Sequence, residues 1–229
     1  MENSKGNIAI AAVTLVVGLA VGGGIGYATG NGGEESQNNN VSTSAPATDT
    51  AAADLRVLLN NLESEHVDLA AAATRAGFDG DKSFDATAAA LDRNSNDLAD
   101  AIGSVYGDEA REGFYEIWAS HIGFFVDYTV AAKAGDQAAM DKAVQNLNGY
   151  VEAISTFLSE ANPNLPKDAV AQLVSEHVGL LKEAVDAHGA GNFAESYAAQ
   201  ERAREQITGD IADTLAGAIV QQKPEAFTN

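Results

Sequence analysis

The stretch LESEHVDLA at residues 62–70 has two related copies further along the chain, IWASHIGFF at 117–125 and LVSEHVGLL at 173–181. The histidines of the three copies are separated by 55 and 56 residues. Each histidine is followed by a β-branched residue, and a glycine stands fourteen residues after it, followed by aspartate or asparagine. This regular spacing indicates a threefold internal repeat, which sets the architecture of the chain.

A helical hairpin is the predicted unit of this repeat. Gly-Asp or Gly-Asn after an apolar run is typical of a helix C-cap followed by the N-cap of the next helix. Apolar residues recur every three to four positions, and proline is rare. The sequence therefore predicts an all-α fold, a six-helix up-down bundle of three hairpins of about 55 residues. The repeats are 52–107, 108–162 and 163–221, and the helices 52–77, 83–105, 108–134, 137–160, 166–189 and 192–221.

The three repeated histidines, His66, His121 and His177, lie on the apolar stripes of their helices. Their imidazoles should therefore point into the bundle at similar heights. Three neutral imidazoles suit zinc or copper and leave one coordination position open. The alternative is a polar layer in the core, in which residues such as Asn94 and Asn146 satisfy the rings without any metal. The sequence leaves both interpretations open.

The N-terminal segment predicts a membrane anchor. Charge is absent from residues 6–33, and residues 8–29 (IAIAAVTLVVGLAVGGGIGYAT) are apolar or small throughout. About 20 such residues span a bilayer as a helix, so residues 1–30 are expected to form a transmembrane anchor. A cleaved signal peptide is the alternative, although it would start with more basic residues. Lys5 and Glu34 flank the segment, and the positive-inside rule then favours a cytoplasmic N-terminus and an extracytoplasmic C-terminal domain in the cell membrane.

Within this segment Gly18, Gly22, Gly26 and Gly30 recur every four residues. This spacing places them on one face of a helix, where the missing side chains let a second helix approach closely. The alternative is that glycine is simply frequent in membrane helices. We expect a transmembrane partner at this glycine face, either another membrane protein or a second copy of the chain.

Composition separates the remaining parts and excludes several classes of protein. Residues 31–50 (NGGEESQNNNVSTSAPATDT) are polar and predict a flexible linker, so residues 51–229 form the helical body. The net charge of −20 argues against nucleic-acid binding, which needs a positive surface. The chain has no cysteine, which excludes disulfides, thiolate metal sites and cysteine catalysis.

No set of residues with catalytic spacing is visible, so the chain is not expected to be an enzyme. Glu63 lies one turn before His66, but the corresponding positions of the other copies hold Trp118 and Val174. No shared carboxylate therefore accompanies the histidines. Aromatic residues concentrate in the third predicted helix, where Tyr115 and Trp118 could form an exposed docking face.

Residues 54–227 resemble a family of exported bacterial helical domains, often named for a copper amine oxidase-like N-terminal domain that accompanies some members. The resemblance rests on LRVLL at 55–59 with Glu65-His66, on LDRN at 91–94, on AIGSVYG at 101–107 and on ANPNL at 161–165. It implies an exported helical domain and no activity, since none is established for the family. The quinone-forming tyrosine of copper amine oxidase needs an Asn-Tyr-acid sequence, which residues 148–151 (NGYV) do not match.

Two functions follow from these patterns. The first is a non-catalytic accessory or scaffold protein that joins a membrane complex through the glycine face and the helical bundle. The second is an extracytoplasmic module that binds copper or zinc through His66, His121 and His177.

Overall fold

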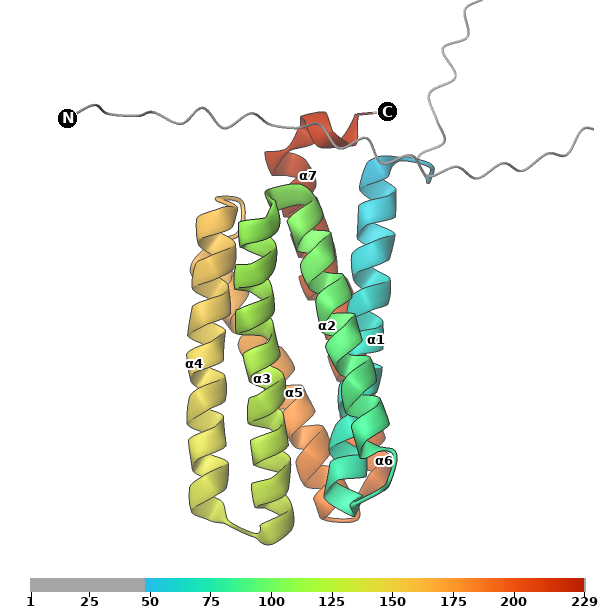
Figure 1. The fold of residues 1–229 in the computed structure, drawn as a ribbon, viewed down its shortest axis with the longest axis vertical. Helices are drawn as coiled ribbons and strands as arrows, with labels where there is room; N and C mark the ends of the chain where they lie inside the picture. Colours follow the sequence, from blue (N-terminus) through green and yellow to red (C-terminus); the bar gives the residue numbers. More distant parts are fainter. Residues whose placement is uncertain (1–47, 229) are drawn as a thin grey trace, which may run out of the picture. The chain divides into compact units, whose positions relative to one another are not determined.

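Six long helical segments make up most of residues 48–228, the part of the chain that the computed structural model describes (Figure 1). The sixth segment is divided by a π-helical turn, and a 3-10 turn follows it; these residues contain no β-strand. The elements are α1 (Ala51–Asp79), α2 (Phe84–Tyr106), α3 (Asp108–Ala134), α4 (Gln137–Ala161), α5 (Lys167–Gly189), α6 (Phe193–Gln206), η1 (Ile207–Ala212), α7 (Asp213–Gln222) and η2 (Pro224–Phe227).

Consecutive helices run in opposite directions and pack as three hairpins, α1–α2, α3–α4 and α5–α6 (Figure 1). The first helices of the three hairpins, α1, α3 and α5, also contact one another. The largest core cluster takes buried side chains from each of them, such as Leu59, Trp118 and Val174. The predicted all-α bundle is therefore confirmed, and every predicted helix boundary lies within two residues of the observed one.

The three hairpin turns are built alike. Gly80, Gly135 and Gly191 have φ angles of 73°, 67° and 76°, a left-handed conformation that glycine adopts without strain. In each turn the next residue donates its backbone N–H to the carbonyl five residues earlier, as in a Schellman motif. These bonds are Asp81 to Ala76 at 2.8 Å, Asp136 to Ala131 at 3.0 Å and Asn192 to Ala187 at 2.8 Å. Each accepting alanine lies ten residues after its histidine, so the repeat fixes how far each turn lies from the histidine.

The residues after the glycines cap the following helices less regularly than the sequence predicts. The Asp136 carboxylate accepts the Ala139 N–H at 3.0 Å and is a true N-cap. Asp81 instead accepts the N–H of Ser83 at 2.7 Å, just before α2 begins. Asn192 makes no side-chain capping bond. Only one of the three predicted N-caps therefore has the expected geometry.

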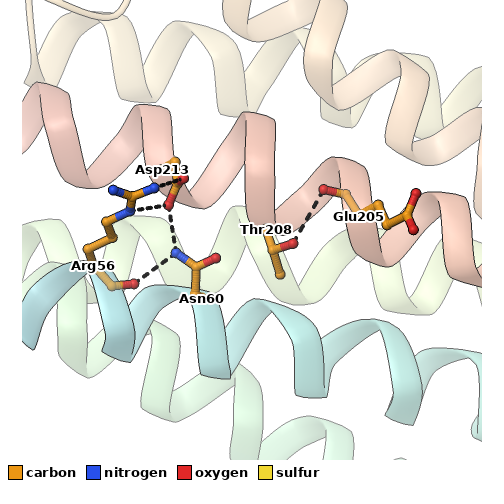
Figure 2. Close-up of polar contacts among 5 residues, drawn as sticks. All are labelled: Arg56, Asn60, Glu205, Thr208 and Asp213. Atoms are coloured by element: carbon orange, nitrogen blue, oxygen red, sulfur yellow. Dashed lines mark hydrogen bonds and ion pairs between the residues drawn. The ribbon is translucent and has the colours of Figure 1, made fainter.

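The π-helical turn η1 lies between α6, which packs mainly against α5, and α7, which packs against α1. The Thr208 hydroxyl donates to the Arg204 carbonyl at 2.8 Å. It also donates to the Glu205 carbonyl at 3.3 Å (Figure 2). It thereby satisfies carbonyls near the point where the wider turn interrupts the regular backbone ladder. A π turn accommodates an extra residue, so the helix before it and the helix after it can each face its own partners.

An ion pair joins the segment after this turn to the first helix (Figure 2). Arg56 Nε of α1 donates to Asp213 Oδ1 at 2.7 Å, and Asn60 Nδ2 donates to the same oxygen at 2.8 Å. The Arg56 side chain is largely exposed, so solvent screens the pair. We therefore read this contact as fixing the register of α7 against α1 more than as a large contribution to stability.

The predicted anchor (residues 1–30) with its glycine series, and most of the predicted linker, lie outside the described residues. Within residues 48–228 no helix has both the length and the apolar character needed to cross a bilayer. Contacts group residues 48–228 into one compact unit. All core clusters of the described residues lie inside this unit, so we expect residues 43–229 to fold on their own.

Two glycine substitutions test the role of the turns. Gly135→Ala should lower the free energy of unfolding by about 1–2 kcal/mol, because a side chain disfavours the left-handed backbone. Gly149→Ala is the control, because Gly149 lies inside α4 with open space around it. That change should raise stability by roughly 0.5–1 kcal/mol. Urea unfolding of residues 43–229 measures both, and equal effects would contradict the assigned role of Gly135.

Candidate functional site

One histidine from each repeat is buried at the centre of the bundle. His66 of α1, His121 of α3 and His177 of α5 expose only 1%, 3% and 6% of their surface. The apolar stripes therefore place all three imidazoles inward, as the sequence predicts.

His66 and His121 face each other directly. Their Nε2 atoms are 3.3 Å apart, and their ring centroids are 5.4 Å apart. The Trp118 ring lies 4.8 Å from both imidazoles, and Tyr150 of α4 stacks on His121 at 4.5 Å. These aromatic rings fix the orientation of the two imidazoles and keep water away from them.

Hydrogen bonds assign the proton positions on two of the rings. His121 Nδ1–H donates to the Trp118 backbone carbonyl, so His121 Nε2 carries a lone pair that faces His66. His177 Nδ1–H donates to Gln206 Oε1 at 3.2 Å. The Gln206 amide is oriented by its own bond to the Leu173 carbonyl at 3.0 Å. His177 Nε2 is therefore also a buried lone pair, and it has no hydrogen-bond partner.

Asn94 of α2 stands beside His66. Its amide nitrogen donates to the Leu62 carbonyl at 2.9 Å and to Glu65 Oε2 at 3.2 Å, which leaves Oδ1 without a partner. Burial lowers the pKa of His66, and the nearby Asn94 side chain opposes this shift. His66 Nδ1 is itself unpaired, so an unused acceptor and an unused ring nitrogen lie in the same part of the core.

Glu63 is the only buried acidic residue in the described part of the chain, with 2% of its surface exposed. Burial raises the pKa of its carboxyl to about 8, and Oε2 has no hydrogen-bond partner. Burial raises the pKa of Tyr150, the residue that stacks on His121, and a charge on Glu63 adds to this shift. The carboxyl therefore belongs to the same buried layer as the histidines.

The three imidazoles are neutral at physiological pH. Burial lowers the pKa of His121 to about 3 and that of His177 to about 4, although their hydrogen bonds to Trp118 and Gln206 oppose the shift. Burial also lowers the pKa of His66 well below its usual value, and the nearby His121 and His177 add to this effect. A neutral imidazole offers a lone pair, which is the form that binds metal ions.

A pocket of about 380 Å³ runs from the histidine pair towards the α1–α2 turn, between α1, α2, α3 and α5. His66 and His121 line its inner end, and Asp81 and Lys82 line its outer end. The walls between these ends are mainly apolar, with bulky side chains that include Phe84, Ile122, Phe125, Leu181 and Val185.

The structure brings two of the three predicted metal ligands together. His177 faces Gln206 instead, and no three histidine, aspartate or glutamate side chains within residues 48–228 are placed to hold one ion. The three-histidine arrangement expected from the sequence is therefore not assembled. The cause is that Gln206 and the Leu173 carbonyl hold the His177 ring separately from the pair.

The prediction that Trp118 belongs to an exposed docking face is wrong. This residue exposes only 7% of its surface, and its ring contacts His66 and His121 inside the core. Tyr115 is half-buried, and its hydroxyl donates to Asp92 Oδ1 at 2.7 Å. The two residues lie near each other on one side of α3, but Trp118 packs into the core whereas the Tyr115 hydroxyl reaches Asp92 of α2 at the edge of the helix.

No protein-family model, curated protein or solved structure matches this chain. The resemblance to exported helical domains therefore stays a prediction from the sequence motifs.

Glu63 and Gln206 are site residues that the sequence analysis did not identify. Glu63 lies four residues after Leu59 and three before His66, which places it on the buried stripe. That spacing is a usable signal, but the corresponding positions hold Trp118 and Val174, so the repeat pattern does not include Glu63 among the site residues. Gln206 gave no signal, since its reach to His177 depends on the packing of α6 against α5.

The stability of the metal-free protein should depend on pH in two opposite ways. Below pH 6.5 the histidines bind protons in the unfolded chain but not in the folded protein. As the pH falls, the free energy of unfolding therefore decreases by about 1.4 kcal/mol per pH unit for each imidazole. From pH 4.5 to about 8 the folded protein keeps the Glu63 proton that the unfolded chain loses, so this group lowers stability as pH rises. The net result is a maximum near pH 7.

Urea unfolding between pH 5 and 8.5 in the presence of EDTA measures this profile. Glu63→Gln should remove the fall in stability between pH 7 and 8, because the amide does not titrate. Glu116→Gln, on the exposed surface of α3, should leave the profile unchanged. A wild-type profile that is flat from pH 7 to 8 would contradict a protonated Glu63.

Proposed function

We propose that residues 51–229 form a metal-binding domain in which His66 and His121 hold one zinc or copper ion. The observation that carries this proposal is the 3.3 Å separation of the two Nε2 atoms. Two nitrogens bound at 2.0–2.1 Å to a tetrahedral ion lie about 3.3 Å apart. The pair therefore has the spacing of two metal ligands before any ion binds.

The proton positions support the same proposal. A metal-bound histidine usually donates its other ring N–H to a carbonyl or carboxylate, which fixes the tautomer. His121 meets this condition through the Trp118 carbonyl. In the metal-free protein, the proton between the two rings then belongs to His66 Nε2, which donates to His121 Nε2.

Metal binding at the pair requires the His66 proton to move from Nε2 to Nδ1. Asn94 supports this change, because its unpaired Oδ1 lies on the part of the core that contains the unpaired His66 Nδ1. After the proton moves to Nδ1, this N–H can donate to Asn94 Oδ1 once the two side chains come within hydrogen-bond distance. The ion replaces the hydrogen bond between the rings without leaving a buried donor unsatisfied.

His177 is the proposed third ligand. Its Nδ1–H is bound to Gln206, and its Nε2 lone pair is buried and free. The ring must shift to reach the ion, since no three donors stand together in the described residues. The resulting set of three imidazoles leaves a fourth position for water or a bound molecule, as in open zinc sites.

We further propose that this domain is carried on the outer side of the cell membrane by residues 1–30. This part of the proposal is supported by the uncharged segment 8–29 and by Lys5 and Glu34 on either side of it. The glycine series supports an accessory role, in which the anchor helix packs against a partner in the membrane.

Metal binding can be tested on residues 43–229 with ring-preserving substitutions. His66→Phe and His121→Phe should each lower the affinity for Zn²⁺ or Cu²⁺ by more than about a hundredfold, because a ligand is lost while aromatic packing remains. His188→Phe is the control, since His188 pairs with Asp79 away from the pair. Elemental analysis and calorimetric titration measure these changes.

The Cu²⁺ form also reports the number of ligands, because nitrogen hyperfine structure in its electron paramagnetic resonance spectrum counts bound imidazoles. Three nitrogens in the wild type and two in His177→Phe are expected. A wild-type domain that takes up no Zn²⁺ or Cu²⁺ at micromolar free concentrations contradicts the proposed function.

The accessory role has its own test in the full-length chain. Gly22→Leu should abolish co-purification with a membrane partner, because the bulky side chain blocks close helix packing. Leu19→Val, between the glycines, is the control. The helical domain should unfold at the same temperature in both variants, and unchanged co-purification in Gly22→Leu would count against the glycine face.

A further inference from the structure

The pocket beside the histidine pair is elongated along α1 and mainly apolar. Its lining on α1 extends from His66 to Gly80, a distance of about 21 Å at 1.5 Å per residue. A pocket with this length and this lining suits an extended hydrocarbon chain.

The pocket exists because the first repeat carries small residues where the third helix carries large ones. Four and seven residues after the histidine, α1 has Ala70 and Ala73, whereas α3 has Phe125 and Tyr128. Both alanines line the pocket. On the opposite wall, α2 also presents a small side chain, that of Ala88. The divergence of α2 from α3 towards the α1–α2 turn widens the same region (Figure 1).

The walls of the pocket are mainly apolar, and they also include the polar residues Thr74, Thr129, His188 and Ser196. His66 and His121 form the inner end, and both are neutral and enclosed by aromatic rings. The outer end carries Lys82 and Arg75 together with Asp81 and Asp85. Lys82 is exposed, while Arg75 is held over the Tyr197 ring at 4.0 Å. An apolar chain can therefore enter from the turn and leave a charged head group in water beside Lys82.

We propose that this pocket binds a single unbranched acyl chain, with its tail directed towards His66 and His121 and its head group at the α1–α2 turn. A free fatty acid and a lysophospholipid present the same chain, so both can supply it. The walls offer the acyl chain a mainly apolar surface along the pocket. This inference is independent of metal binding, because the chain occupies the pocket and makes no bond to the ring nitrogens.

A chain-length series tests the proposal directly. Residues 43–229 are titrated in EDTA with saturated fatty acids from decanoic to hexadecanoic acid, each below its micelle-forming concentration. The affinity should rise about fourfold for every added methylene, because each one is removed from water, until the chain fills the pocket. Lysophosphatidylcholines of the same lengths identify the source of the chain. Affinity that is independent of length in both series would overturn the proposal.

Pocket-filling variants locate the binding site. Ala73→Leu on α1 and Ala88→Leu on α2 narrow the pocket from opposite walls. Each should lower the affinity for hexadecanoic acid at least tenfold without lowering Tm. Ala72→Leu and Ala89→Leu are the matched controls, since these neighbours lie outside the lining. An equal loss of affinity in the variants and their controls would overturn the assignment of the binding site to this pocket.

One further variant separates this inference from the metal proposal. His121→Phe removes a metal ligand but keeps an apolar inner end, so it should still bind the acyl chain. A domain that binds metal and no acyl chain refutes the pocket proposal alone. A domain that binds the chain and no metal refutes the metal proposal alone.

Discussion

The burial of three neutral imidazoles in one layer of an apolar bundle is the constraint on which the rest of this structure depends. Removing an imidazole from water is unfavourable unless its polar nitrogens find partners. Trp118 offers a backbone carbonyl to His121, and Gln206 offers an amide oxygen to His177. The helices that carry the three rings, α1, α3 and α5, contact one another around this layer.

The helical architecture could be read from the sequence, because its signals are local and occur three times. The apolar stripe, the glycine in a left-handed turn and the histidine ten residues before the capped carbonyl recur in each repeat. The inward direction of the histidines follows from helical periodicity alone. Repetition therefore made the fold and the position of the layer predictable.

The chemistry within the layer could not be read in this way, because it depends on residues that break the repeat. Glu63 has no copy, and Gln206 and Asn94 reach the histidines from helices whose packing the sequence does not specify. The contact of His66 with His121 and the hydrogen bond of His177 with Gln206 are both specific to single copies of the repeat. The pocket is likewise a departure from the repeat, where alanine in α1 replaces the aromatic residues of α3.

The π turn at Ile207–Ala212 divides the last helix into two segments that make separate contacts. The segment before it ends at Gln206, in contact with His177, and the segment after it begins at Asp213, in contact with Arg56. A continuous α-helix would transmit any rotation at the histidine layer directly to the C-terminal end. The wide turn absorbs such a rotation locally, so the ring of His177 can change its position while the contacts between α1 and α7 stay in register.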